Sequence, residues 1–457
     1  MRGFGSPQMN FVIEQVVEMA AQKVGMSGIE FRRRNMVRQG SVTITGQKLD
    51  GHKVAMEQVL DTVLREIDYE KKLARCSHGC DAPSQSVCAT PSSRDGINDT
   101  SSLLTAAGDE ASPSLPATRA SQPREVSDEL YGIGLAMSYR GVSLGAEGVD
   151  FCAAIINAQA DGSIFLETGI HENGQGSESA MSLICAEELG VSLDRIRYRR
   201  SSTSNIPDSG TTVASRGTIM GGGAVTLAAR ELKAKIAAAF CEKLGCTAEE
   251  VRFKDNFICG KSDANHIDFA DAMRQMWAMQ KFPFALGTFK APCVSWDEHT
   301  GQGDAYFTWV YGCQAVELTV NKKSGKVKLL NAIAAHDVGR AVNPEMVRGQ
   351  IYGGMAMSAG YGLHEEVKGP GGKMTTLNLN TYRIPRSMDL PEMKVIIIEN
   401  PDPVSPTGAK SIGEPANEIL APAIANAIFN ATGQRHFSLP IKLGAIPGTT
   451  CCEEGCK

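Results

Sequence analysis

The sequence lacks the features that mark several large classes of protein. No apolar run approaches the ~18 residues that a membrane-spanning helix needs, and the longest tracts, such as residues 395–398, have the length of a strand. The net charge of −5 leaves no basic excess, which argues against a nucleic-acid partner held through its phosphates. Met1 is not followed by the basic start and apolar segment of a signal peptide. We therefore expect a cytoplasmic protein without a membrane span.

Common nucleotide-binding and catalytic motifs are also missing. Gly132-Ile133-Gly134 is not followed by the third glycine of a dinucleotide-binding fingerprint, and no Walker A pattern occurs. No CxxC pair offers an iron–sulfur site, and no GxSxG pattern offers a serine nucleophile. The 13 cysteines follow no disulfide framework. Those in apolar segments, such as Cys152, Cys185 and Cys313, are expected to be small buried side chains in a reducing compartment.

The sequence does have an ordinary globular balance, with 42% hydrophobic and 21% charged residues, and a high count of 47 glycines. Its 457 residues are enough for about two to four packing units. Apolar residues at helical spacing predict helices over residues 7–24, 29–37 and 55–73. The first of these is predicted from the series Phe11, Val12, Val16, Met19, Ala20 and Val24.

The composition changes after the third predicted helix. Residues 75–127 are rich in Ser, Pro, Thr, Ala and Asp, and no aromatic residue lies between Tyr69 and Tyr131. Such a segment buries too little apolar area to offset its ordering entropy, so we expect a surface excursion or a disordered linker. The polar tail at residues 450–457, with its clustered thiols, is expected to be frayed. The linker holds possible zinc ligands that lack a familiar spacing: Cys76, His78, Cys80 and Cys88.

From Tyr131 onward strand patterns alternate with helix patterns, which predicts an α/β fold of mixed sheets with helices packed on them. We expect a helical segment over residues 1–74, the linker over 75–127 and a main domain over 128–457. A hairpin is predicted around Lys323-Ser324-Gly325-Lys326. The main domain is further predicted to contain strands at 151–157, 164–166 and 393–398, and helices at 178–189, 219–244 and 419–432.

Four glycine-containing segments stand directly before predicted helices, whose first N–H groups are free to meet an anion. They are residues 2–8, 169–176, 209–218 and 410–418. The third crowds small residues and hydroxyls together, which suits a phosphate or the polar edge of a cofactor. In the fourth, Glu414 follows a glycine at the start of a helix. By spacing alone we would interpret it as an ordinary first-turn acid, which the helix dipole favours.

In this order, the segments resemble the motifs of the xanthine dehydrogenase and aldehyde oxidase family of molybdenum hydroxylases. Arg2-Gly3-Phe4-Gly5, followed by Pro7-Gln8, is similar to the family's RGFGxPQ. Gly413-Glu414-Pro415 is similar to the GEP that carries the catalytic glutamate. Asn173-Gly174-Gln175-Gly176 resembles MGQG with Asn in place of Met, and Val213-Ala214-Ser215 resembles AAS with Val in place of the first Ala.

Other stretches extend the resemblance to nearly the whole chain outside the linker and the tail. Asp337-Val338-Gly339, with Asn343-Pro344 and Gly349-Gln350, resembles a further family stretch, and Tyr382-Arg383-Ile384-Pro385 resembles TYKIP. Residues 139–148 look closer to the anaerobic bacterial branch, which includes split nicotinate dehydrogenases and selenium-dependent purine hydroxylases. The resemblance therefore implies the C-terminal half of a molybdenum-cofactor-binding region.

The cofactor implied by the resemblance is a molybdenum pyranopterin, usually a cytosine dinucleotide in bacteria, with a Mo=S or Mo=Se ligand. Its dithiolene holds the metal, so no side chain is expected to ligate it. Glu414 is implied as the general base, with Phe4 and Arg2 at a flat aromatic substrate. The residues implied to bind the cofactor are Gly174, Gln175, Gly176, Ala214, Ser215, Arg216, Gly217, Thr218, Gln350 and Gly413.

The resemblance also implies partners, because the sequence contains no counterpart of the family's preceding half, iron–sulfur domains or flavin domain. We expect a second molybdopterin-binding subunit, an Fe–S subunit and an FAD subunit. The expected reaction hydroxylates an N-heterocycle, either nicotinate or a purine such as xanthine, with oxygen from water. An aldehyde oxidoreductase subunit and a non-catalytic truncated remnant stay open as alternatives, since the residues that orient the substrate lie largely in the other half.

Overall fold

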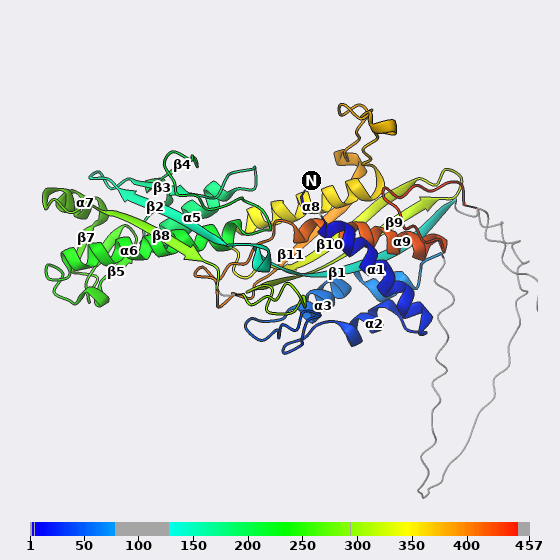
Figure 1. Ribbon diagram of the computed structural model, residues 1–457, viewed down its shortest axis with the longest axis horizontal. Helices are drawn as coiled ribbons and strands as arrows, with labels where there is room; N and C mark the ends of the chain where they lie inside the picture. Colours follow the sequence, from blue (N-terminus) through cyan, green and yellow to red (C-terminus); the bar gives the residue numbers. More distant parts are fainter. Residues whose placement is uncertain (1, 4, 78–127, 293, 447–457) are drawn as a thin grey trace, which may run out of the picture.

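The computed structural model describes residues 2–3, 5–77, 128–292 and 294–446, and the predicted linker beyond residue 77 and the cysteine-containing tail lie outside them. The molecule has two lobes along its long axis, each built on a four-stranded sheet (Figure 1). We call the lobe that holds the first helices of the chain the proximal lobe and the other the distal lobe. Helices pack on both sheets, which confirms the predicted α/β class. Among the helices of the described residues, none is long and apolar enough to cross a bilayer.

The sheet of the proximal lobe sorts its side chains onto two cores. Along the strand β9 (Trp309–Asn321), Val316 and Leu318 point to one face of the sheet, whereas Cys313 and Ala315 point to the other. The first three strands are antiparallel and the last is parallel to its neighbour. In spatial order the strands are β1 (Glu129–Gly141), β9 (Trp309–Asn321), β10 (Val327–Asp337) and β11 (Glu392–Ile398).

Helices cover both faces of this sheet. The helix α9 (Leu420–Thr432) lies directly on β1, because a Cβ built on Gly134 would stand 2.3 Å from the backbone nitrogen of Ala427. The two glycines of Gly132-Ile133-Gly134 thus allow the close packing of the helix on the sheet and do not form a nucleotide-binding turn. The helix α8 (Pro344–Leu363) packs beside α9. The remaining helices of this lobe are α1 (Ser6–Lys23), α2 (Gly28–Asn35), α3 (Met56–Ile67) and α4 (Tyr69–Leu73).

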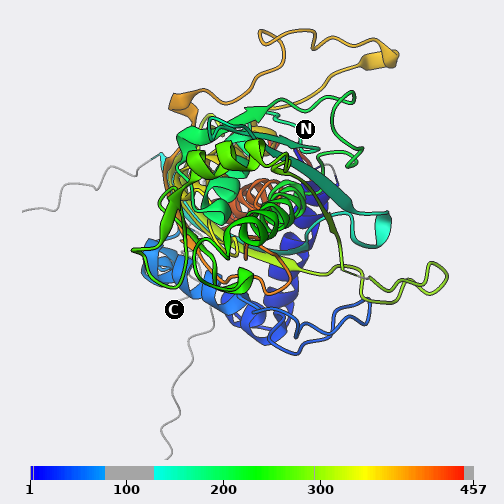
Figure 2. The same cartoon turned by 90° about the vertical axis from the view of Figure 1, so that its left-hand side faces the viewer.

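The distal lobe repeats the arrangement of a sheet covered by helices around a core of its own. The chain enters it directly from β1, whose last residue is Gly141. Figure 2 views the molecule from this end. A small three-stranded sheet and α7 (Phe269–Ala278) close the end of the lobe. The main sheet has the order β4 (Ile196–Arg199), β3 (Ile164–Thr168), β2 (Phe151–Ala158) and β8 (Phe284–Lys290), with α5 (Ser177–Leu189) and α6 (Gly222–Phe240) packed on it, and the small sheet joins β5 (Arg252–Lys254), β6 (Phe257–Cys259) and β7 (His266–Asp268).

Most predicted elements are present within a few residues of their expected bounds, including the hairpin of β9 and β10. Two predictions were wrong. The helix expected over residues 55–73 is two helices, because Asp68 adopts a left-handed conformation with φ of 53° that ends α3. The helix expected over 219–244 begins only at Gly222, after a π-helical turn at Gly217–Gly221, and ends at Phe240. The division at residues 74 and 127 stays a prediction.

The expectation for the cysteines is confirmed for the three that we singled out. Cys152, Cys185 and Cys313 are each 0% exposed and carry free thiols. Burial raises the pKa of the Cys185 and Cys313 thiols. Neutral, desolvated thiols of this kind act as small core side chains.

Candidate functional site

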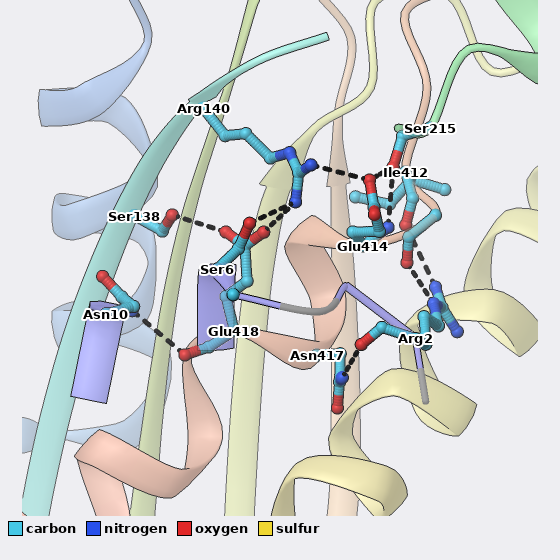
Figure 3. Close-up of polar contacts among 12 residues, drawn as sticks. Arg2, Ser6, Asn10, Ser138, Arg140, Ser215, Ile412, Glu414, Asn417 and Glu418 are labelled. Atoms are coloured by element: carbon cyan, nitrogen blue, oxygen red, sulfur yellow. Dashed lines mark hydrogen bonds and ion pairs between the residues drawn. The ribbon is translucent and has the colours of Figure 1, made fainter. Parts of the chain in front are cut away.

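The predicted motifs converge where the two lobes meet. Ser215 comes from the loop that leads into α6 of the distal lobe, whereas Glu414 precedes α9 of the proximal lobe. Their side chains touch, although 199 residues separate them in sequence. Arg2, which precedes α1, lies on the other side of Glu414 (Figure 3).

The Glu414 carboxylate is held in place at one of its two oxygens. Oε2 accepts a hydrogen bond of 2.9 Å from the Ser215 hydroxyl and lies 2.8 Å from Nη2 of Arg140. The Glu414 main-chain N–H donates to the same Ser215 hydroxyl oxygen at 2.8 Å. Among the described residues, none bonds to Oε1. The side chain is 15% exposed, so this oxygen is fixed in direction yet open to a ligand.

Arg140 at the end of β1 links Glu414 to a second acid that we did not predict. Its guanidinium also pairs with Glu418, which is 2% exposed and accepts a further bond of 2.9 Å from Ser138 (Figure 3). Ser6 accepts from the same guanidinium at 3.0 Å. In the sequence, the only indication of this role was that Arg140 is a charged residue on the face of β1 that packs under α9. One cation thus orients two carboxylates, of which one is buried.

Arg2 binds backbone carbonyls and leaves the carboxylates to Arg140. Its guanidinium donates to the carbonyl oxygens of Gly413, of Ile412 at 3.2 Å and of Gln350 at 3.2 Å. Asn417 donates in turn to the Arg2 carbonyl at 2.6 Å. Burial lowers the pKa of the Arg2 guanidinium to about 10, and the Glu414 charge offsets part of this effect. Phe4, the predicted stacking residue, lies outside the described residues.

The turn that carries Ala214 and Ser215 is strained. Both residues have positive φ, 48° and 55°, and the Arg216 N–H donates to the Val213 carbonyl at 3.1 Å, as in a mirror-image turn that normally takes glycine. Such conformations cost on the order of 1–3 kcal/mol each and cluster at functional sites. Within the described residues, no acceptor meets the N–H groups of Ala214 and Ser215. The turn therefore presents two free donors next to Glu414.

Arg216, one of the residues predicted to bind the cofactor, uses its own N–H inside this turn. Its guanidinium points into the protein, where it pairs with Asp150 at 2.7 Å, and both side chains are at most 2% exposed. It also donates to the carbonyls of Ser209 at 2.8 Å and Thr211 at 3.1 Å. Arg216 is thus a buried support beneath the strained turn.

Beside these groups lies a small pocket of about 70 Å³, lined by both polar and apolar side chains. Among the predicted residues, its lining includes Gln175, Gly176, Thr218 and Gln350. The Ser411 hydroxyl also lines it and is buried without a hydrogen-bond partner. A buried polar group without a partner is costly, so this hydroxyl suits a ligand that carries polar atoms.

The loop before α5 is held by its own side chains. Gln175 donates to the His171 carbonyl at 2.6 Å, so its amide must turn to reach a ligand. The Glu172 carboxylate accepts from the N–H groups of Gly174 at 2.7 Å, Gly176 at 3.0 Å and Glu178 at 3.0 Å. Burial alone would raise the pKa of Glu172, but these N–H groups outweigh it and the pKa falls. Glu172 therefore fills the start of α5 that we had expected to be open.

A larger hollow of about 480 Å³ lies at the far end of the distal lobe, away from the predicted motifs. Its lining includes Met273, Trp277 and Phe284 and carries no charged side chain. It offers no group that could move a proton. The junction of the lobes, which joins a carboxylate oxygen without a bond, free N–H groups and a pocket with polar side chains in its lining, is the better candidate site.

The residues at the junction fit a polar, phosphate-bearing cofactor. Free N–H groups in a tight turn bind anions, and the pocket adds side-chain amides and hydroxyls. The two cations in its lining, Arg340 and Lys410, are paired with Glu187 and with the buried Asp337. Gly413 fits this cradle closely, since a Cβ there would lie 2.9 Å from the Ser215 hydroxyl. No cluster of three or more His, Cys, Asp or Glu side chains able to hold a metal ion occurs among the described residues.

Comparison with known proteins identifies the family of this chain. The family models for the molybdopterin cofactor-binding domain match residues 111–391 and 1–36. The chain is 27% identical to the xanthine dehydrogenase molybdenum-binding subunit of Escherichia coli O157:H7 and 26% identical to the aldehyde oxidoreductase of Megalodesulfovibrio gigas. Each match covers 96% of this chain, and 52% and 40% of the relative, respectively. The chain thus spans about half the length, or less, of these relatives.

A solved structure shares the fold of this chain. The quinoline 2-oxidoreductase of Pseudomonas putida 86 superposes with a TM-score of 0.73 at 20% identity, over 93% of this chain and 49% of that one. The match of one family model to more than half of the chain is independent of this likeness. The chain therefore belongs to the molybdopterin cofactor-binding domain family, and within it to the molybdenum-binding part of the xanthine dehydrogenase family.

Proposed function

We propose that this chain is the catalytic molybdopterin-binding subunit of a molybdenum hydroxylase, with Glu414 as the general base. The observation that carries the proposal is the Glu414 carboxylate, fixed through Oε2 by Ser215 and Arg140 and open at Oε1, beside a pocket lined in part by polar side chains. A base must be held in direction while one lone pair stays available. Glu414 meets both conditions.

The residues that would hold the cofactor surround this carboxylate. Ala214 and Ser215 offer main-chain N–H groups, and Ser411 offers a hydroxyl without a partner. Gln175, in the loop before α5, and Gln350, on α8, both line the pocket. When bound, the group supplies the two-electron redox chemistry and the water-derived oxygen. We propose the cytosine dinucleotide form with a sulfido or selenido ligand.

The hydrogen bonds and ion pairs of the site are consistent with a separate role for each side chain. Glu414 would accept a proton at Oε1, while Oε2 keeps its bonds to Ser215 and Arg140. Arg140 would stay paired with Glu418 whether or not Glu414 carries the proton. The carboxylate can therefore change its charge without losing its position, which a base needs in every cycle.

We further propose that the substrate is an N-heterocycle, either nicotinate or a purine such as xanthine, and that Phe4 and Arg2 lie beside it. Support comes from the likeness to a relative named as a xanthine dehydrogenase molybdenum-binding subunit. An aldehyde oxidoreductase is the second candidate, because a relative of nearly equal identity carries that name. Electrons would leave to Fe–S and FAD partner subunits in the cytoplasm. A non-catalytic remnant is disfavoured by the orientation of Glu414.

The test is the Glu414→Gln variant, purified as the native complex. We expect it to retain its molybdenum, measured by mass spectrometry of the metal, while turnover falls by roughly a hundredfold to ten-thousandfold. Glu345→Gln is the matched control, because Glu345 lies on α8 near the pocket with 84% of its side chain exposed. Turnover of xanthine and nicotinate against that of an aromatic aldehyde separates the two substrate classes. Normal turnover in Glu414→Gln would remove this residue from the mechanism.

A further inference from the structure

The outward face of α1 is aliphatic. Its exposed apolar side chains follow helical spacing and are 42–59% exposed. No charged residue interrupts this face between Met9 and Met19. A surface helix of a single folded body normally shows the opposite, with charged residues outward. The face, which we call the α1 stripe, consists of Met9, Val12, Ile13, Val16 and Met19.

The inward face of the same helix is unusually polar. Glu14, 5% exposed, pairs with the buried Arg32 at 2.6 Å, and Gln15, 2% exposed, donates to the His436 carbonyl at 2.9 Å. Asn10 donates to the Glu418 carbonyl at 3.0 Å. Only Phe11 and a few small residues of α1 enter the apolar core. A helix that is polar towards its own chain and aliphatic on the outside has its apolar partner elsewhere.

The comparisons indicate what that partner is. One model of the molybdopterin cofactor-binding domain matches residues 1–36, which include all of α1, while the curated relatives reported above are about twice as long as the matched region, or longer. About half of the relatives' length therefore has no counterpart in this chain. Such material needs a surface to pack on, and an exposed aliphatic face of this extent marks an interaction site.

The helix that carries the α1 stripe begins at the candidate site, which its inward face contacts. The helix begins at Ser6, whose hydroxyl accepts from Arg140, and Asn10 on its next turn binds beside Glu418 (Figure 3). In Figure 1, α1 lies along the outside of the proximal lobe. A body seated on the stripe would therefore lie on a helix whose first turns hold Arg140 and Glu418.

We propose that the α1 stripe is the docking surface for the polypeptide that supplies the other half of the molybdopterin-binding region. The partner's contact surface is then aliphatic or aromatic at its centre, because the stripe offers no charge to pair. This inference rests on the proposed function for the identity of the partner. A second copy of this chain is the competing occupant.

The experiment compares tagged wild-type chain with Val16→Glu and Ile44→Glu, each expressed with its natural complex. Val16 is 57% exposed in the stripe, whereas Ile44 is 92% exposed on a loop bridged to Gly303. The glutamate at position 16 would be desolvated without a partner, so we expect at least a tenfold loss of the co-purified molybdopterin-binding polypeptide, identified by mass spectrometry. Ile44→Glu should keep it. Equal melting temperatures of the isolated variants exclude misfolding.

A second measurement needs no variant. Oxidation of Met9 and Met19 should slow at least about fivefold in the complex relative to the isolated chain, because burial shields the thioethers. Met279, 47% exposed in the distal lobe, is the internal control and should not change. Full recovery of the partner with Val16→Glu, unchanged oxidation of both methionines, or a homodimer without the second polypeptide would overturn the inference. Molybdenum in the wild-type complex is assayed separately, so its absence would refute the proposed function and leave the docking result intact.

Discussion

The buried pair of Arg216 and Asp150 makes a quantitative prediction about the support of the site. The Asp150 carboxylate accepts from Arg216 at 2.7 Å through Oδ1 and from the Leu144 N–H at 2.9 Å through Oδ2. Ser143 donates to the same Oδ2. The pair thus ties the strand entering the distal lobe to the strained turn at Ala214. Asp150→Asn keeps the shape of the side chain and removes its charge.

The magnitude follows from burial. Both side chains are at most 2% exposed, and breaking a buried ion pair by removing one partner costs about 3–5 kcal/mol. Because the asparagine retains one oxygen and Arg216 keeps its carbonyl acceptors, we expect the lower end, about 3 kcal/mol. For a unit of 150–250 residues this corresponds to a fall in melting temperature of roughly 6–12 °C.

The assay is thermal unfolding by circular dichroism, together with the molybdenum content of the purified complex. Asp271→Asn is the matched control, since Asp271 pairs with Arg274 at the same 2.7 Å but with side chains 54% and 64% exposed. Surface substitutions of this kind change stability by less than about 0.5 kcal/mol. Equal melting shifts for the two variants would refute the view that burial makes the Asp150 pair a support of the turn.

Two further predictions concern pH and backbone packing. Burial lowers the pKa of His336 to about 3, so between pH ~6.5 and pH 3 the unfolded chain binds a proton that the folded chain does not. The free energy of unfolding should therefore fall by about 1.4 kcal/mol per pH unit towards pH 3. In urea titrations between pH ~7 and ~5, His336→Gln should flatten this slope. Gly413→Ala should push Ser215 from Glu414 and lower both molybdenum content and turnover of the complex, whereas Gly349→Ala, where nothing lies within 4 Å of the added Cβ, should change neither.

Much of the fold was predictable because local signals were strong. The helices predicted to end at residues 189 and 432 do end there, each followed by a glycine in the left-handed conformation, and the hairpin at Lys323–Lys326 has its predicted place. The break at Asp68 was missed because aspartate is not restricted to that conformation and the apolar series runs through it. Local patterns therefore located the elements better than they located the interruptions within them.

Only those residues of the candidate site that belong to a recognisable motif could be predicted from the sequence. The likeness of short segments to family motifs singled out Arg2, Ser215 and Glu414 together. In the structure Ser215 bonds to Glu414, and Arg2 bonds to the carbonyl of the neighbouring Gly413. The Arg140–Glu418 pair spans 278 residues and carries no local signature. Similarly, the apolar series of α1 predicts the helix but not its direction, because Val12 and Val16 face outward. Long-range pairing and the location of an apolar partner are properties of the folded assembly.

The meeting of the two lobes at the site has a consequence for stability measurements. Ser215 belongs to one lobe and Glu414 to the other, so a ligand that bridges them binds only when both are folded and correctly apposed. By mass action, such a ligand stabilises both lobes together in proportion to its occupancy. Calorimetry of the empty chain should then resolve two separate transitions, and the loaded chain should melt in one. Bound cofactor would couple the unfolding of the two lobes, and a destabilising substitution in either lobe would first reduce the amount of bound metal.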